Sequence, residues 1–419
     1  MPSTSLNEGR IFTLMKTSLL FPLVLVLGSL LHAASYYSHP EKGRSENSGT
    51  AESPWPGLEQ LIQDGSLAKL QPGDTLYLGS GFHGQARISG ENASPITIAA
   101  AAENNPKLAK LEIGSGKNWI IRGLEVSPAF AEAPYKGYIV TVGESGKASD
   151  IVVEDCFVYS TLDTKGWSAK QWMSTYGGML QGRNGSAITF RNNYVLNVRW
   201  GITMTSFDSF CMGNVISDFS GDAIRVTRDN AEVAYNVIKN IYVGAKDGDA
   251  NHDDAIQCFV FNKGRGTMRN LNIHHNYIHT REDENQEWPA VMQGVGLFDG
   301  PLIGFTVSDN VMALDHWHGV SLYDAQECLI ENNVIYNPWG GKLQPWVLLG
   351  SKLKQVHGNT VTNNFAHSIR LGEDKTVTAE GNGTVTEAMY NTRSKQLLDE
   401  IDEKFGAEHP VAHRGRMGK

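Results

Sequence analysis

One short stretch of the chain concentrates side chains that carry acid–base chemistry. The sequence Asp249-Ala-Asn-His-Asp-Asp-Ala-Ile-Gln257 contains three carboxylates and a histidine. Adjacent like charges such as Asp253 and Asp254 cost free energy unless a nearby group neutralises them. An earlier phrase of the same form, Ser220-Gly-Asp-Ala-Ile-Arg225, adds another carboxylate and a guanidinium. We therefore expect an acid–base site here, with turn capping by the Asp side chains as the structural alternative.

These groups suit the abstraction of a proton next to a carboxylate. Arg225 can bind a substrate carboxylate through two parallel hydrogen bonds, but its pKa is too high for a base. His252 titrates near neutral pH and is the preferred base, whereas Lys239 would need a lowered pKa. Tyr323 is the candidate that returns the proton. We add Asp253 and Asp254 to the catalytic candidates because either carboxyl can transfer a proton.

Polar and aromatic residues further along the chain could bind a substrate. The phrase His316-Trp-His-Gly-Val-Ser-Leu-Tyr323 lies two repeats after the acidic stretch. Fork-shaped donors combined with aromatic rings suit a linear polysaccharide, although a single tryptophan is more often a packing residue. The substrate-binding candidates are Gln257, Arg228, His318, Ser321 and Trp288.

The same carboxylates raise the question of a bound cation. Ca²⁺ prefers hard oxygen ligands, and it would also neutralise an acidic substrate. Its candidate ligands are Asp222, Asp249 and Asp253. The chain has no spacing typical of a calcium-binding loop, so the sequence requires no cofactor and leaves Ca²⁺ as an alternative.

The elements that position these residues repeat along the chain. An Asn followed by apolar residues recurs at intervals of 21, 22, 40, 34, 23 and 26 residues. A strand-like alternation precedes each Asn, and a further short strand lies about eleven residues earlier. Three strands per repeat predict a coil whose turns stack and whose Asn residues close the same tight corner. The repeating residues are Asn193, Asn214, Asn236, Asn276, Asn310, Asn333 and Asn359.

Three repeats are longer than the basic period of about 22 residues. Their extra residues fall at about 160–177, 240–253 and 280–293, between the strand after the Asn corner and the first strand of the next coil. Loops that project beside a flat strand face predict a substrate groove. The outward positions of the first strands along this face are Thr203, Arg225, Gln257, Gly296, Ser321, Leu348 and Arg370.

The pattern resembles the right-handed parallel β-helix superfamily of pectate-lyase type over roughly residues 71–385. The phrases Tyr36-Tyr37 and Gln71-Pro-Gly-Asp-Thr-Leu-Tyr-Leu78 look like the entry of secreted β-helix polysaccharide enzymes. The resemblance implies an all-β, single-domain right-handed parallel β-helix with short helical caps. It also implies β-elimination on a uronate-containing polysaccharide, with alginate-like polymers as the first expectation. Some lyases of this architecture use a lysine and an arginine on adjacent coils, and no such pair stands out here.

Two other functions stay open on the same fold. His252-Asp-Asp-Ala-Ile-Gln257 and His318-Gly-Val-Ser-Leu322 look somewhat like strands of polygalacturonases. In such an inverting glycoside hydrolase, Asp253 or Asp254 is the acid and Asp222 helps to hold the water, with carboxyl groups about 6.5–9.5 Å apart. Against it, the phrase around Asp222 lacks the expected Asn-Thr-Asp, and the His-Gly strand comes one coil late. A non-catalytic carbohydrate-binding β-helix is the third alternative.

The domain boundaries follow from this assignment. Residues 1–35 combine a lysine, an apolar run from Leu19 to Leu31 and small residues, which is the order of a secretory signal. The run is too short to span a bilayer, so we expect a secreted or periplasmic protein without a membrane span. The other expected parts are an N-terminal extension with a cap helix at 36–70, the β-helix at 71–385, a C-terminal helical cap at 386–408 and a polar tail at 409–419.

Composition limits the partners of the chain. Its 45 Asp and Glu against 36 Lys and Arg give a net charge of −9, which disfavours nucleic acid. With 41% hydrophobic and only 19% charged residues, the 419-residue chain is globular with a large core. The four cysteines lie in strand-like segments without framework spacing, which predicts free, buried thiols. We expect a monomer that binds an acidic polysaccharide in one positively charged cleft.

Overall fold

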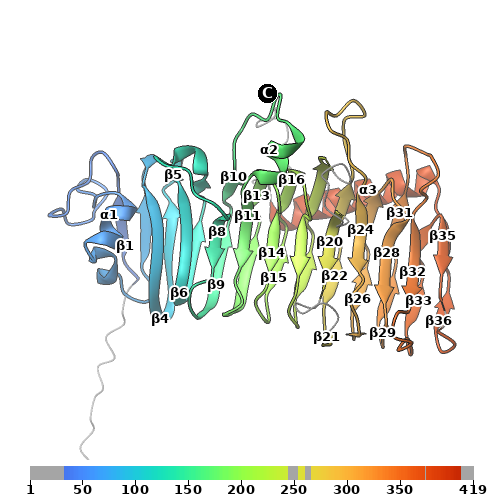
Figure 1. The fold of residues 1–419 in the computed structure, drawn as a ribbon. Coiled ribbons are helices and arrows are strands. Elements are labelled where there is room, and N and C mark those ends of the chain that lie inside the picture. The colour runs from blue at the N-terminus through green and yellow to red at the C-terminus, as the bar shows by residue number, and fades with distance from the viewer. Residues whose placement is uncertain (1–32, 244–252, 260–265, 373, 407–419) are drawn as a thin grey trace, which may run out of the picture. The chain divides into compact units, whose positions relative to one another are not determined.

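The computed structural model describes residues 33–243, 253–259, 266–372 and 374–406. The expected signal segment, apart from its last three residues, and the expected polar tail lie outside these residues. The described chain is wound into stacked parallel coils, as Figure 1 shows. This arrangement confirms the predicted parallel β-helix. The stacking satisfies the backbone hydrogen bonds of each strand through the next coil, about 4.8 Å away.

The strands form three rows, and each row pairs in parallel along the coil. Row 1 contains β8 (Tyr138–Val142), β11 (Gly177–Gln181), β14 (Ile202–Met204), β17 (Ile224–Val226), β20 (Asp254–Cys258), β24 (Gln293–Leu297), β28 (His318–Tyr323), β32 (Trp346–Gly350) and β35 (Ser368–Arg370). Row 2 contains β1 (Ser35–Ser38), β2 (Thr75–Leu78), β9 (Ala148–Glu154), β12 (Gly185–Arg191), β15 (Phe210–Met212), β18 (Glu232–Ala234), β22 (Asn272–His274), β26 (Thr306–Ser308), β30 (Leu329–Glu331), β33 (Thr360–Thr362) and β36 (Thr378–Glu380). Row 3 contains β3 (Gly81–Phe82), β5 (Pro106–Leu108), β7 (Glu125–Val126), β10 (Phe157–Tyr159), β13 (Tyr194–Val198), β16 (Val215–Phe219), β19 (Val237–Ile241), β23 (Tyr277–His279), β27 (Val311–Ala313), β31 (Val334–Tyr336), β34 (Phe365–Ala366) and β37 (Gly383–Thr384).

Rows 1 and 2 belong to one sheet because two long strands run through both of them. These strands are β4 (Gln85–Ala100) and β6 (Lys110–Arg122). A minor three-stranded sheet joins the later coils through β21 (Met268–Arg269), β25 (Leu302–Ile303) and β29 (Ala325–Gln326). Along the strands, apolar residues such as Ile224 and Val226 point into one continuous core, and the residue between them points outward.

A ladder of buried asparagines closes the corner between rows 2 and 3. Each side-chain amide donates to the side-chain oxygen of the next asparagine, at 2.8–3.1 Å. The residue before each asparagine has a positive φ, for example 57° at Tyr235, so the bend lies one position earlier than the sequence suggests. The ladder contains Asn193, Asn214, Asn236, Asn276, Asn310, Asn333, Asn364 and Asn382.

The predicted ladder is wrong at one position. Asn359 precedes β33 in row 2, where its side-chain oxygen accepts the backbone N–H of Cys328 at 3.0 Å. The ladder position in that coil belongs to Asn364, five residues later. The two phrases look alike because a buried Asn satisfies a strand entry in the same way at either corner.

We expect Asn236→Ala to lower the free energy of unfolding by about 3 kcal/mol, because it leaves several buried groups without a partner. The Asn236 amide donates to Cys211 O and to Asn276 Oδ1, and its oxygen accepts from the Asn214 backbone at 2.9 Å. Urea unfolding measures the change. Asn285→Ala, at an exposed position of the third insert, serves as the control and should change stability by less than about 0.5 kcal/mol. Equal losses in both variants would contradict a structural role of the ladder.

The N-terminal helix lies at the beginning of the coil, in the segment where the sequence predicts a cap helix (Figure 1). Helix α1 (Leu58–Gln63) packs on β4, followed by the short helix Ser66–Lys69, and buries Leu58 and Leu61 in the main core. Its neighbour β1 already pairs with β2, so the coil begins inside the expected N-terminal extension.

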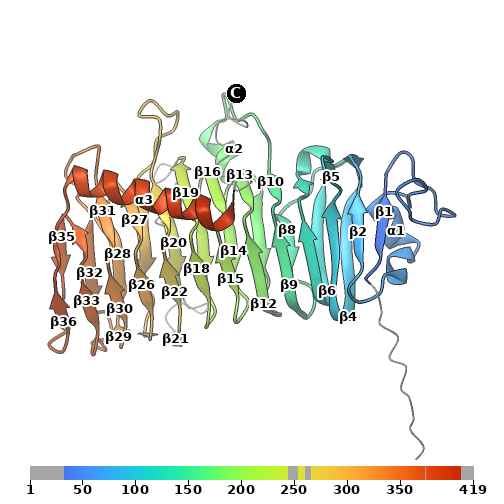
Figure 2. The same ribbon diagram turned by 180° about the vertical axis from the view of Figure 1, so that it is seen from behind.

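Helix α3 (Glu387–Phe405) does not close the last coil. It packs along row 3 against β23, β27 and β31, as Figure 2 shows. Its stripe of Tyr390, Leu397 and Ile401 forms a second core with that sheet, because the outward-facing valines of row 3 would otherwise be exposed to water.

The cysteines and the helices of the described residues bear on two further predictions. All four cysteines are free and buried, as the sequence predicts. Among the helices of the described residues, none combines the length and apolar character that a membrane span requires.

Candidate functional site

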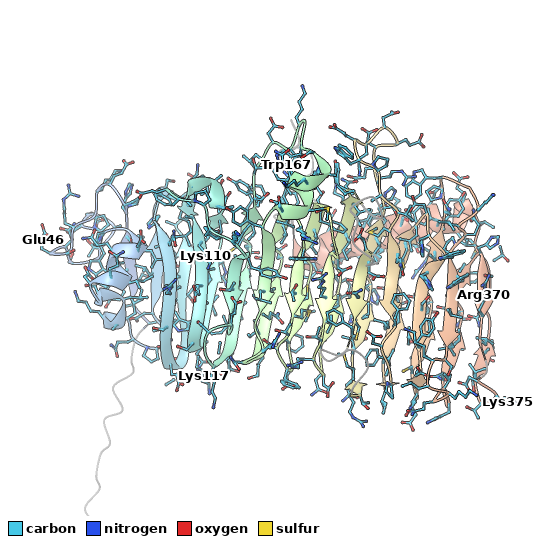
Figure 3. The ribbon with its side chains drawn as sticks, in the orientation of Figure 1. Glu46, Lys110, Lys117, Trp167, Arg370 and Lys375 are labelled. Atoms are coloured by element: carbon cyan, nitrogen blue, oxygen red, sulfur yellow. The ribbon has the colours of Figure 1, made fainter. Side chains whose placement is uncertain are left out.

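The register of row 1 aligns the seven outward positions in the predicted order. Thr203 pairs with Arg225, Arg225 with Gln257, and Gln257 with Gly296 in successive coils. The same row continues through Ser321, Leu348 and Arg370. We call this outward surface the row 1 face. Arg370 marks its far end at the right of Figure 3.

Arg225 is held by the carboxylate three residues before it. Its Nε lies 2.5 Å from Oδ2 of Asp222, and its guanidinium lies 4.7 Å from the centre of the Trp200 ring. Asp222 is only 3% exposed, and its other oxygen accepts the backbone N–H of Asp254 at 2.9 Å. This carboxylate therefore orients Arg225 and fixes the entry of the next coil.

Asp254 is fully buried on the coil that follows. Gln257 donates to its Oδ2 at 3.0 Å, while its Oδ1 has no hydrogen-bond partner among the described residues. The carboxyl fits because the facing residue is Gly296, where a Cβ would lie 2.2 Å from Oδ1. Burial, reinforced by the charges of Asp222 and Asp253, raises the pKa of Asp254 well above its ordinary value. Asp254 therefore releases its proton at a higher pH than an ordinary Asp does.

We expect this raised pKa to make the stability of the protein fall as the pH rises. The folded state binds the Asp254 proton more tightly than the unfolded state, so its contribution is present at low pH. It is lost as the pH passes the folded pKa, with a slope of up to about 1.4 kcal/mol per pH unit. Asp254→Asn, which mimics the neutral acid, should remove this fall when unfolding is measured from about pH 4, near the pKa of Asp in the unfolded chain, upward.

The control for that experiment is Asp283→Asn, which makes the same charge change at an exposed position of the third insert. It should keep the pH profile of the wild-type protein. Identical profiles for Asp254→Asn and the wild type would contradict a protonated Asp254. Because Asp222 and Asp253 interact with this group, the midpoint describes the cluster rather than one carboxyl.

Tyr138 joins the site from β8, three coils before Arg225, and sequence reasoning missed it. Its ring lies over β11 because Gly177 leaves room, and a Cβ there would be 2.6 Å from the ring. The hydroxyl reaches Thr203 Oγ1 at 2.7 Å, and the ring stacks on Trp200 with centroids 6.5 Å apart. Burial raises the pKa of Tyr138, and the charges of Arg225 and Asp222 act on it with opposite signs. Extending the row 1 register from Thr203 leads to Leu180 and Thr141 rather than to Tyr138, so the row pattern in the sequence does not mark this tyrosine.

The predicted His-Gly strand forms a second cluster on β28. His318 Nδ1 lies 2.9 Å from Ser321 Oγ, and Trp346 Nε1 donates to the same hydroxyl at 3.3 Å. The ring of Tyr323 lies over Gly350, and burial raises its pKa. Three coil spacings, about 14 Å, separate β28 from the strand of Arg225. The Tyr323 ring extends over Gly350 of β32, the strand beyond β28, whereas the Tyr138 hydroxyl reaches Thr203, the neighbour of Arg225. The structure therefore groups Tyr138 rather than Tyr323 with Arg225, and we correct the assignment of Tyr323 as proton donor.

Two other predicted residues lie apart from this site. Lys239 is on β19 in row 3, with Nζ 2.6 Å from Oε2 of Glu282, which corrects its assignment as a base. Arg228 lies in the turn after β17, over the ring of Phe207 at 5.4 Å. Lys239 and Arg228 are both separated from the site, because row 3 and the turn after β17 are not part of the row 1 face.

The long inserts contact one another. Trp172, on helix α2 (Ala169–Ser174) of the first insert, stacks on Tyr242 of the second with centroids 4.2 Å apart. Trp288 of the third insert donates from Nε1 to Trp167 O at 2.8 Å. Figure 3 shows Trp167 above the coils. Trp288 is 36% exposed, so its indole combines this structural contact with an open face.

The described residues alone do not form the candidate calcium site. Within residues 33–243, 253–259, 266–372 and 374–406, no group of three or more His, Cys, Asp or Glu side chains could hold a metal ion. The oxygens of Asp222 bind Arg225 and the Asp254 backbone instead. Asp253 is buried, and its carbonyl accepts the Gln293 N–H at 3.0 Å. The predicted base His252 and ligand Asp249 lie outside the described residues.

Comparisons with known proteins define the class of fold. No protein-family model matches the chain, and no curated protein sequence matches it. A rhamnogalacturonan lyase structure is similar over 79% of this chain and 87% of its own, with 13% identity and a TM-score of 0.50. The chain thus shares its parallel β-helix fold with this structure.

Two further solved structures are similar at lower scores. A lacto-N-biosidase from Eubacterium ramulus has 13% identity and a TM-score of 0.48, over 83% of this chain and 68% of its own. XylC in complex with xylose has 8% identity and a TM-score of 0.47, over 83% and 86%.

Proposed function

We propose that the protein is a secreted or periplasmic polysaccharide lyase that cleaves a uronate-containing, alginate-like polysaccharide by β-elimination. The observation that carries this proposal is the grouping of Arg225, clamped by Asp222, with the half-buried phenol of Tyr138 on one strand face. The guanidinium suits a sugar carboxylate, and the phenol suits an oxygen that needs a proton.

Each part of the elimination has a candidate group. Arg225 binds the carboxylate next to C5 and stabilises the charge that develops when the C5–H bond breaks. A base takes that proton, the electron pair forms the C4–C5 double bond, and the C4–O bond breaks. Tyr138 keeps its proton because burial raises its pKa, so it can protonate the leaving oxygen. His252 is the proposed base, on the strength of its place in the sequence directly before Asp253.

The burial and the contacts of Asp222 and Asp254 favour this lyase over an inverting hydrolase that would use these two carboxyl groups. A hydrolase needs one carboxyl group that reaches the glycosidic oxygen and another that reaches a water. Asp254 has no exposed surface, and Asp222 is occupied by Arg225 and the Asp254 backbone. A fold shared with a rhamnogalacturonan lyase agrees with a carbohydrate substrate.

The test is incubation with alginate, polygalacturonate and neutral glycans, followed by two readings. Ultraviolet absorbance of unsaturated uronate together with new reducing ends supports β-elimination. Reducing ends without that absorbance would instead indicate hydrolysis. If none of these substrates is cleaved, with or without added Ca²⁺, only the carbohydrate-binding alternative is left and the proposal is contradicted.

A further inference from the structure

Arg370 presents a cation at the far end of the row 1 face. Its guanidinium carbon lies 3.8 Å from the centre of the Trp346 ring on the preceding coil. No carboxylate of the described residues forms an ion pair with it, and the side chain is exposed. A guanidinium that lies flat on an aromatic ring keeps its N–H edge available for an anion.

Neighbouring side chains hold the Trp346 ring in place. Its Nε1 donates to Ser321 Oγ, and Trp317 stacks on the ring with centroids 5.7 Å and planes 18° apart. Trp317 precedes β28 and Arg370 lies on β35, so they contact Trp346 from the coils on its two sides. Trp317 is 43% exposed, which adds an apolar surface of the kind that covers a sugar ring.

The arrangement repeats what surrounds Arg225. There too, an arginine at the outward position lies over a tryptophan at the strand entry of the preceding coil, Trp200. The two arginines occupy β17 and β35 of the same row, which are five coil spacings apart. Five spacings correspond to about 24 Å. A coil spacing is comparable with the length of one sugar unit, so about five units of an extended chain would separate the two guanidinium groups.

We propose that Arg370, on its Trp346 support, is a distal subsite for an acidic sugar unit about five units from the unit bound by Arg225. This inference rests on the proposed function and extends it to substrate length. A chain of about six acidic units engages both arginines, whereas a shorter one engages only one of them. The protein therefore favours internal bonds of long polyanionic chains.

Binding of end-labelled oligouronates tests this subsite without any need for cleavage. Initial fluorescence anisotropy is measured with mannuronate and galacturonate oligomers from dimer to octamer at fixed ionic strength. The affinity should rise about tenfold between tetramer and octamer, because one more charge-assisted contact forms. Arg370→Ala should abolish that rise. Arg370→Lys should recover only part of it, since an ammonium cannot form the planar fork.

Arg269→Ala is the matched control, because it removes the same charge from an exposed residue of β21 outside row 1. It should keep the full rise in affinity. The subsite is overturned if no oligomer binds or if the affinity does not depend on oligomer length. It is also overturned if Arg370→Ala and Arg269→Ala lower the affinity equally. Failure of the proposed reaction would look different, as length-dependent binding without any unsaturated product.

Discussion

Arg225→Ala should lower kcat/KM on a cleavable polyuronate by about 10²–10³-fold. The guanidinium binds the substrate carboxylate and becomes more important as charge develops on it during proton abstraction, so its loss raises the barrier as well as KM. Steady-state absorbance of the unsaturated product measures the effect. Arg225→Lys should recover only a small part of the activity, because lysine provides the charge without the fork.

The control for Arg225→Ala tests the effect on Asp222, which loses its ion-pair partner in this variant. Asp222 is 3% exposed and loses its counter-ion in this variant, which destabilises the fold in its own right. The double variant Asp222→Asn with Arg225→Ala removes the stranded charge. It should regain much of the thermal stability but none of the turnover. Regained turnover would mean that Arg225 serves Asp222 rather than the substrate.

Tyr138→Phe should lower kcat by about 10²-fold while KM changes little. The phenylalanine ring keeps the space over Gly177 and the contact with Trp200, so only the proton donor is removed. General acids contribute effects of about this size. Stopped-time product assays give kcat, and thermal unfolding should show a loss of about 1 kcal/mol or less for the Thr203 hydrogen bond.

A substrate with a more acidic leaving group separates a proton donor from a packing residue. Such a leaving oxygen needs little protonation, so it should restore most of the activity of Tyr138→Phe. Tyr323→Phe is the competing variant, because Tyr323 is the tyrosine that the sequence suggests for this role. If Tyr323→Phe loses turnover and Tyr138→Phe does not, the assignment of the acid is wrong.

The grouping of Arg225, Tyr138 and Asp222 also explains why a lysine–arginine pair is unnecessary for the proposed reaction. The carboxylate-binding group and the acid come from strands three coils apart, bridged by a long aromatic side chain. Gly177 in β11 permits this bridge. Substitution of Gly177 by any larger residue would therefore act on the site through Tyr138.

The sequence by itself determined the fold and the alignment of the row 1 face. In a coil, each residue contacts the one that lies a repeat later, so the repeat length and the alternation of apolar residues fix the register. This is why the order from Thr203 to Arg370 was predictable, as were the buried thiols. Asn359 was misplaced because two different corners use the same residue for the same hydrogen bonds.

Only the tertiary structure decided which side chains meet. The reach of Tyr138 across Gly177, the burial of Asp254 against Gly296 and the support of Arg370 by Trp346 each depend on residues from different coils. Likewise, helix α3 covers row 3 rather than the end of the coil, because its stripe finds the larger apolar surface there. The repeats define the path of the backbone. Side-chain length, the absence of a Cβ atom at glycine and local burial define the contacts and the pKa values, and the repeat pattern of the sequence does not specify them.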